Sequence, residues 1–129
     1  MSSTPVITII DDDESVRTAT ESLIRSLGFS ACTFASAEDF LHSPSLGRTD
    51  CVITDVQMPG MSGVELQSTL RARGDRTPLI FITAFPEERI RRQVQAAGAF
   101  GFLAKPFDGD AMIACLDRAL GEGGAASSH

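Results

Sequence analysis

The hydrophobic residues of this chain gather in five short, nearly continuous apolar runs that alternate with segments of helical periodicity. Consecutive apolar positions over four or five residues are typical of strands buried on both faces of a parallel sheet. Strands are predicted at residues 6–10, 31–34, 51–54, 79–83 and 100–103. Repeated strand–helix units favour a single α/β domain, in which helices cover both faces of a five-stranded parallel sheet.

The intervening segments carry apolar residues three or four positions apart, as amphipathic helices do. Helices are predicted at residues 14–27 and 37–41, and then after Ser62, Pro86 and Asp108. Ser62 and Glu65 have the spacing of a capping box, and Pro86 suits a first helical turn. The residues predicted to face inward are Val16, Ala19, Leu23 and Leu27, then Ile90, Val94 and Ala97, and finally Met112, Cys115, Leu116 and Ala119. We expect the domain to span residues 5–120 and residues 121–129 to form a flexible tail.

Length and composition narrow the class of protein. A chain of 129 residues suits one domain, and 17 acidic against 11 basic residues give a formal charge of −6. That charge argues against nucleic-acid binding, which needs a basic surface. The cysteines, Cys32, Cys51 and Cys115, show no disulfide or zinc spacing, and the last two are predicted to be buried thiols. With no leader pattern and no membrane-spanning run, the expected location is the cytoplasm.

Three of the predicted strands end on residues that suit chemistry with charge. Asp55 directly follows the run 51–54, an acidic stretch at 11–13 follows the first strand, and Lys105 follows the last. The carboxyl ends of parallel strands meet at one edge of the sheet, where ligands bind. Carboxylates for a hard cation and a lysine are therefore expected in one place.

These residues stand in segments that resemble the receiver domain of bacterial two-component response regulators, over nearly the whole of residues 5–120. The matching segments are IDDD at 10–13 with VR at 16–17, TDVQMPGMSG at 54–63, ITA at 82–84, and the stretch from AGA to KPF at 97–107. Each match is weak alone, but together, in this order and spacing, they are specific. The resemblance implies the flavodoxin-like strand order 2-1-3-4-5.

The resemblance also implies an activity. Asp55 would accept a phosphoryl group from the phosphohistidine of a sensor histidine kinase or a histidine phosphotransfer protein, in a phosphorelay. Asp11, Asp12, Asp55 and the backbone carbonyl of Gln57 would bind Mg²⁺, with Mn²⁺ or Ca²⁺ able to substitute. Asp13 is interpreted as a helix cap, and the register is supported by a basic residue, Arg17, five positions after Asp12. Such a protein is a phosphoacceptor that promotes only its own phosphorylation and dephosphorylation, and is not an enzyme.

The same resemblance implies a switch. The Thr83 hydroxyl and Lys105 would bind phosphoryl oxygens, and Phe102 would be the aromatic residue that fills the space left when Thr83 moves inward. The Lys105–Pro106 bond is expected to be cis. The surface formed by the fourth helix, fifth strand and fifth helix would then change shape and signal to a downstream protein, or pair with a second copy. Phe85, two positions after Thr83, is hypothesised to restrict attacking water.

Several alternatives stay open at this point. The chain could be a receiver-like binding module that works without phosphorylation. A phosphohydrolase of the haloacid dehalogenase type needs an acid two positions after its nucleophile, where Gln57 stands, and a flavodoxin-like cofactor binder would meet repulsion from the acids at 11–13. Arg89, Arg91 and Arg92 suit either a partner-binding patch or a solvated helix face. Finally, the chain could be a stand-alone receiver or the receiver of a longer regulator.

Overall fold

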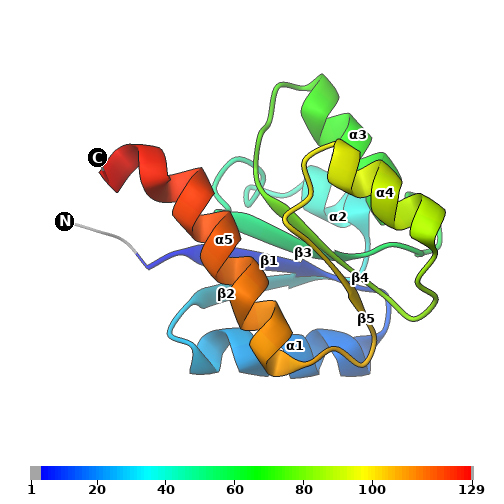
Figure 1. Cartoon of the computed structure of the whole chain (residues 1–129), viewed down its shortest axis with the longest axis horizontal. Coiled ribbons are helices and arrows are strands. Elements are labelled where there is room, and N and C mark those ends of the chain that lie inside the picture. Colours follow the sequence, from blue (N-terminus) through cyan, green and yellow to red (C-terminus); the bar gives the residue numbers. More distant parts are fainter. Residues whose placement is uncertain (1–3, 129) are drawn as a thin grey trace.

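The computed structural model describes the backbone of residues 4–128 and the side chains of residues 4–121. It contains one five-stranded parallel sheet in the order β2-β1-β3-β4-β5, as expected (Figure 1). The strands are β1 (Val6–Ile10), β2 (Ser30–Phe34), β3 (Cys51–Asp55), β4 (Leu79–Thr83) and β5 (Gly101–Ala104). The helices are α1 (Glu14–Ser26), α2 (Ala37–Leu41), α3 (Gly63–Ala72), α4 (Glu88–Ala96) and α5 (Gly109–Ser128).

The apolar runs are continuous because successive strand residues enter two different hydrophobic cores. In β3, Cys51 and Ile53 pack beneath α1 and α5, whereas Val52 packs on the opposite face beneath α2, α3 and α4. Figure 1 shows these two groups of helices on either side of the sheet. Cys51 and Cys115 are buried thiols as predicted, and burial raises the pKa of the Cys51 thiol to about 12. Both faces of the central strands are therefore covered, which leaves their carboxyl ends as the accessible edge.

Side-chain caps fix where α1 and α3 begin. The Asp13 carboxylate accepts hydrogen bonds from the amides of Ser15 and Val16, so this third acid caps α1. Ser62 and Glu65 form the predicted capping box at α3, in which each side chain bonds the other's backbone amide. These caps place the ends of the strand–helix loops, which carry the candidate site.

Three details of the helix predictions are wrong. Pro86 does not lie in the first turn of α4, because the extended backbone of Glu87 (φ −122°, ψ 131°) delays the helix to Glu88. Ala19 is exposed and Thr20 is buried instead, since the stripe through positions 16, 20, 24 and 27 fits helical spacing equally well. Ala97 is exposed because it is the C-cap, after which Gly98 (φ +98°) turns the chain away.

The C-terminal helix buries the predicted residues Met112, Cys115, Leu116 and Ala119. Its backbone continues to Ser128, into the segment for which the sequence predicts a flexible tail. Side chains are described only to residue 121, so the mobility of this tail stays a prediction. No helix within the described residues is long and apolar enough to cross a membrane.

Candidate functional site

The candidate site is built from the carboxyl ends of β1, β3 and β5. Asp11 directly follows β1, Asp55 is the last residue of β3, and Lys105 directly follows β5. The Lys105 amide also donates to the Thr83 carbonyl (2.8 Å), which aligns the ends of β4 and β5. Parallel pairing thus brings together residues that are far apart in the sequence, as the strand-end pattern predicts.

An ion-paired lysine lies at the centre of this site. Lys105 Nζ is 2.8 Å from Asp11 Oδ2 and 3.0 Å from Asp55 Oδ2, and the three side chains are 14%, 0% and 9% exposed, respectively. Among the described residues, Asp11 Oδ2 has no partner in hydrogen-bond geometry, so the lysine charge is its principal compensation. The Lys105–Pro106 bond is cis, as the resemblance implies.

Burial and neighbouring charges change how these groups titrate. Burial raises the pKa of Asp55, with Asp11 adding to the increase, and together they outweigh the opposing hydrogen bond from Lys105. For Lys105, burial lowers the pKa, but pairing with Asp11 and Asp55 exceeds that effect and the net direction is upward. The lysine therefore stays charged at neutral pH, while the Asp55 carboxylate is less stable as an anion than it would be in water.

Three carboxylates of the site lie close enough to share a cation. Oxygens of Asp11, Asp12 and Asp55 are all within 4.8 Å of one another, with Asp12 exposed and the other two buried. One lysine against three acids leaves an excess of negative charge. An all-oxygen donor set with excess negative charge fits a hard divalent cation such as Mg²⁺ or Ca²⁺, so the residues present suit the metal that the sequence predicts.

The backbone around Asp11 is held by two contacts that orient its carboxylate. Asp11 Oδ1 accepts the amide of Asp13 (2.9 Å), and the Asp11 carbonyl accepts Nη1 of Arg17 (2.8 Å). Asp13 caps α1 through its own carboxylate. This geometry agrees with the interpretation of Asp13 as a cap and gives Arg17 a structural contact, which the sequence spacing did not specify.

The remaining predicted residues surround the same edge. The Gln57 amide donates to Asp55 Oδ1 (3.2 Å), so the loop after β3 folds back over the strand end. The Thr83 hydroxyl is buried and accepts the amide of Phe85 (3.1 Å). The Phe85 side chain is 70% exposed. Within the described residues, it is the only large hydrophobic side chain that is exposed.

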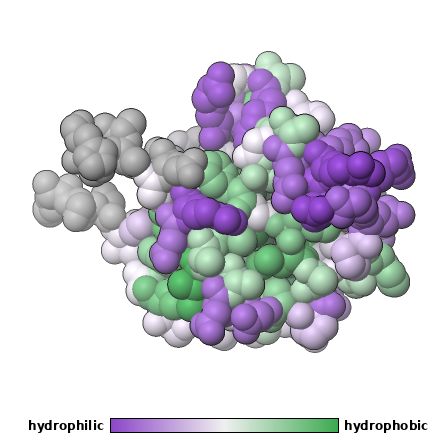
Figure 2. Space-filling model, viewed as in Figure 1, coloured by the Kyte–Doolittle hydropathy of each residue, from purple (hydrophilic) through white to green (hydrophobic). Residues whose placement is uncertain are grey.

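Phe102 lies away from the charged cluster, between two hollows on the outer face of β5. One, of about 380 Å³, lies beside the start of α4 and is lined by Pro86, Glu87, Glu88, Arg91, Phe102 and Ala104. The other, of about 630 Å³, lies between α4, β5 and α5 and includes Phe100 and Leu103. Figure 2 shows hydrophilic surface over α4 and more hydrophobic surface between α4 and α5. Phe102 is half-buried, and the two hollows leave space beside its ring.

One residue that contacts the site's loop could not be recognised from the sequence. Glu38, in α2, accepts the amide of Met61 through Oε2 (2.9 Å), and these residues are 23 positions apart. The available sequence signal was weak, because an acid in the first turn of a helix is commonplace.

Comparison with known proteins identifies the class. Residues 7–117 match the family described as response regulator receiver domain, so the chain belongs to the receiver domains of two-component response regulators, whose general function is to accept a phosphoryl group. The haloacid dehalogenase and cofactor-binding alternatives are not favoured.

Individual relatives support the same assignment. The chain is 38% identical to the response regulator protein TodT of Pseudomonas putida over 115 residues, which cover 89% of this chain and 51% of TodT. The structure is similar to the response regulator StyR (TM-score 0.89, 36% identity, 98% of this chain and 64% of StyR). It also resembles the Vibrio cholerae chemotaxis protein CheY4 (TM-score 0.82, 28% identity, 92% of this chain and all of CheY4). The chain spans about half the length of the curated relatives it matches.

Proposed function

We propose that Asp55 is the phosphoacceptor of this receiver domain, and that its donor is a phosphohistidine on a sensor histidine kinase or a histidine phosphotransfer protein. An Asp55 carboxylate oxygen would form a bond to phosphorus as the phosphorus–nitrogen bond of the donor breaks, and the imidazole nitrogen keeps the electron pair. The observation that carries the proposal is the 3.0 Å contact between Lys105 Nζ and Asp55 Oδ2. It places a cation beside the Asp55 carboxylate, where charge changes as the phosphoryl group is transferred.

The proposal includes a divalent metal site formed by Asp11, Asp12, Asp55 and the Gln57 carbonyl, with Mg²⁺ as the ion and Mn²⁺ or Ca²⁺ as substitutes. When bound, the ion would offset charge on the transferring phosphoryl group. Support comes from the three carboxylates within 4.8 Å of one another. In this reaction the domain promotes only its own phosphorylation and dephosphorylation, without turnover of another substrate.

The proposed switch links the site to the outer face of the sheet. The Thr83 hydroxyl, which accepts the Phe85 amide, would instead donate to a phosphoryl oxygen, and Lys105 would follow the new negative charge. Phe102 would then move into the space next to β4 and β5. The hollow of about 380 Å³ beside Phe102 supports this movement, because it leaves space next to the ring.

The α4–β5–α5 face is the proposed signalling surface. It would bind a downstream protein, or a second copy of the chain after phosphorylation, in a cytoplasmic setting and without direct contact with nucleic acid. Support comes from the groove between α4, β5 and α5, whose lining includes the half-buried Phe102. On α4, Glu88 pairs with Arg91 and lies 3.9 Å from Arg92, so part of the basic charge of that helix is already compensated.

Intact mass after incubation with acetyl phosphate tests the phosphoacceptor directly. We expect the wild-type protein to gain one phosphoryl group only with Mg²⁺, and Asp55→Asn to gain none. A matched pair tests the metal ligands: Asp12→Asn should lose the reaction, whereas Asp13→Asn, which keeps a good helix cap, should retain it. An unmodified wild-type protein with a native far-UV circular dichroism spectrum would refute the proposal in favour of a binding module that works without phosphorylation.

A further inference from the structure

The loop between β3 and α3 is held at its centre by a side chain from another part of the chain. At its start, the Gln57 amide bonds Asp55 Oδ1 (3.2 Å), and at its end, the Ser62 amide bonds Glu65 Oε1 (2.9 Å). Between these two points, within the described residues, the hydrogen bond that ties the loop to a different element is the one from the Met61 amide to Glu38 Oε2 (2.9 Å). Glu38, which is part of α2, thus connects that helix to the loop.

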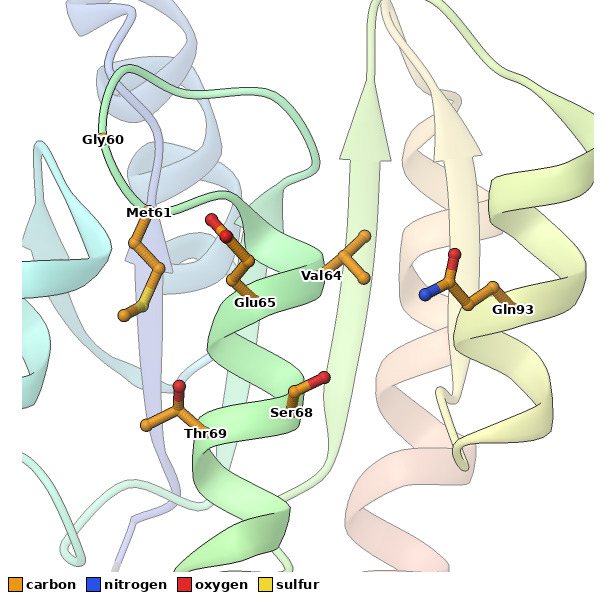
Figure 3. Close-up of a pocket in the computed structure, with 7 residues that line it drawn as sticks. All are labelled: Gly60, Met61, Val64, Glu65, Ser68, Thr69 and Gln93. Carbon is orange, nitrogen blue, oxygen red and sulfur yellow. The ribbon is translucent and has the colours of Figure 1, made fainter.

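Packing holds the loop only in part: the Met58 and Met61 side chains contact the core beneath α2, α3 and α4, whereas the other side of the loop is open. There Gly60 and Met61 form the rim of an open groove of about 630 Å³, whose other lining residues are Val64, Glu65, Ser68, Thr69 and Gln93 (Figure 3). Figure 3 shows Gly60 on the loop ahead of α3, and Gln93 on α4 across the groove. Because the groove side is open, the bond to Glu38 is the hydrogen bond that connects the centre of the loop to another element within the described residues.

The backbone of the loop is shaped for a close approach to that carboxylate. Gly60 has φ +76°, a conformation that glycine adopts easily and other residues rarely do. A Cβ at this position would lie 2.5 Å from Glu38 Oε2. The glycine therefore allows both the turn and the contact between its neighbouring amide and the carboxylate.

The carboxylate is also kept in its ionised form. The hydrogen bond from the Met61 amide is the main cause that lowers the pKa of Glu38, and its own backbone amide contributes. The side chain is half-buried. An acid that merely complemented the dipole of α2 would need no such contact, and Asp39, the other acid of that first turn, is exposed and forms none with the loop.

We propose that Glu38 is a positioning residue that fixes the loop from Gln57 to Met61 and, through it, the backbone carbonyl that takes part in metal binding. The inference rests on the proposed metal site, since Gln57 is the ligand that the loop carries. Glu38 does not touch the reacting groups itself, so its effect reaches them through the loop backbone. Residues outside the ligand set that orient ligands commonly change metal affinity about tenfold or more when they are removed.

The test compares Glu38→Ala, Glu38→Gln and the matched control Asp39→Ala with the wild-type protein. Mg²⁺ affinity is measured by calorimetry, and hydrogen exchange of the Met61 amide is measured by NMR without metal. We expect Glu38→Ala to weaken Mg²⁺ binding about tenfold and to remove protection of the Met61 amide. Glu38→Gln, which keeps an acceptor oxygen, should restore most of both, and Asp39→Ala should change neither.

The outcomes separate this inference from the proposed function. Equal Mg²⁺ affinity in Glu38→Ala and Asp39→Ala would overturn the role of Glu38 and leave the metal site intact. A wild-type protein that binds no Mg²⁺ would instead refute the metal site itself. Gly60→Ala is an independent variant, because its added methyl group would push the Glu38 carboxylate away from the loop. We expect it to weaken Mg²⁺ binding. The effect should be smaller when Glu38 is already alanine.

Discussion

Replacing Lys105 with methionine should strongly destabilise the protein in the absence of divalent metal. The ammonium group lies within 3.0 Å of oxygens of both Asp11 and Asp55, and these two carboxylates are almost completely buried. Methionine keeps most of the volume but leaves two buried acids without their cation. Removing one partner of a buried ion pair typically costs about 3–5 kcal/mol. Because the site lies at an edge of the sheet beside the exposed Asp12, we expect the lower part of that range, about 3 kcal/mol.

Urea unfolding followed by far-UV circular dichroism measures this loss, because the chain has no Trp or Tyr for fluorescence. For a domain of this size, about 3 kcal/mol corresponds to a fall in Tm of roughly 12 °C. Mg²⁺ should reduce the difference in free energy of unfolding between the variant and the wild-type protein, since a bound cation would compensate part of the negative charge of Asp11 and Asp55.

A double-mutant cycle identifies the cause of the loss. In an Asp55→Asn background one of the two carboxylates is neutral, so Lys105→Met should cost at least about 1 kcal/mol less. The reasoning would be refuted if Lys105→Met changed the free energy of unfolding by less than about 0.5 kcal/mol, or if the two substitutions were additive.

Three further predictions concern the same edge of the sheet. Gly63→Ala would place its methyl group against the Asp55 carbonyl and 3.3 Å from the Phe81 ring, so it should cost about 1–3 kcal/mol in urea unfolding and slow phosphorylation by acetyl phosphate. Gly109→Ala, where the added Cβ meets nothing within 4 Å, is the control and should change neither. Phe85→Ala should speed loss of the phosphoryl group, measured as decay of phosphorylated protein by mass spectrometry, and an unchanged rate would exclude the shielding role of this exposed ring. Because burial raises the pKa of Asp55, its anion opposes folding above the ordinary pKa of an aspartate. Asp55→Asn should therefore increase the free energy of unfolding at neutral pH in the absence of divalent metal, and this gain should shrink as the pH falls towards about 4. A gain that did not depend on pH would contradict that cause.

Much of the fold could be predicted because its determinants are local. The near-continuous apolar runs, such as residues 79–83, need only a strand buried on both faces, and the observed β4 has those bounds. The meeting of Asp11, Asp55 and Lys105 could also be predicted, because parallel strands place their carboxyl ends at one edge. Residue roles at this edge still came from the resemblance, since spacing alone does not distinguish a ligand from a cap.

The parts that could not be predicted depend on non-local or nearly equivalent choices. Helical periodicity did not decide between Ala19 and Thr20 for the inner face of α1, because a rotation of one position leaves the other apolar residues almost as well buried. The contact between Glu38 and Met61 joins α2 to the loop after β3, and the two residues are 23 positions apart in the sequence. It also depends on the backbone turn at Gly60. No pattern in either segment specifies that their ends meet.

The contacts of Lys105 compensate the charge of the site only in part. In the structure this lysine contacts Asp11 and Asp55 together, and burial still raises the pKa of Asp55. The lysine therefore compensates the charge of the two carboxylates only in part, and additional positive charge near them would still be favourable. On the proposed function, a phosphoryl group on Asp55 would move the negative charge outward, and Lys105 would have to leave its present position to follow it. A site in which the lysine fully neutralised its partners would resist that exchange more strongly, so on the proposed function incomplete compensation favours the switch.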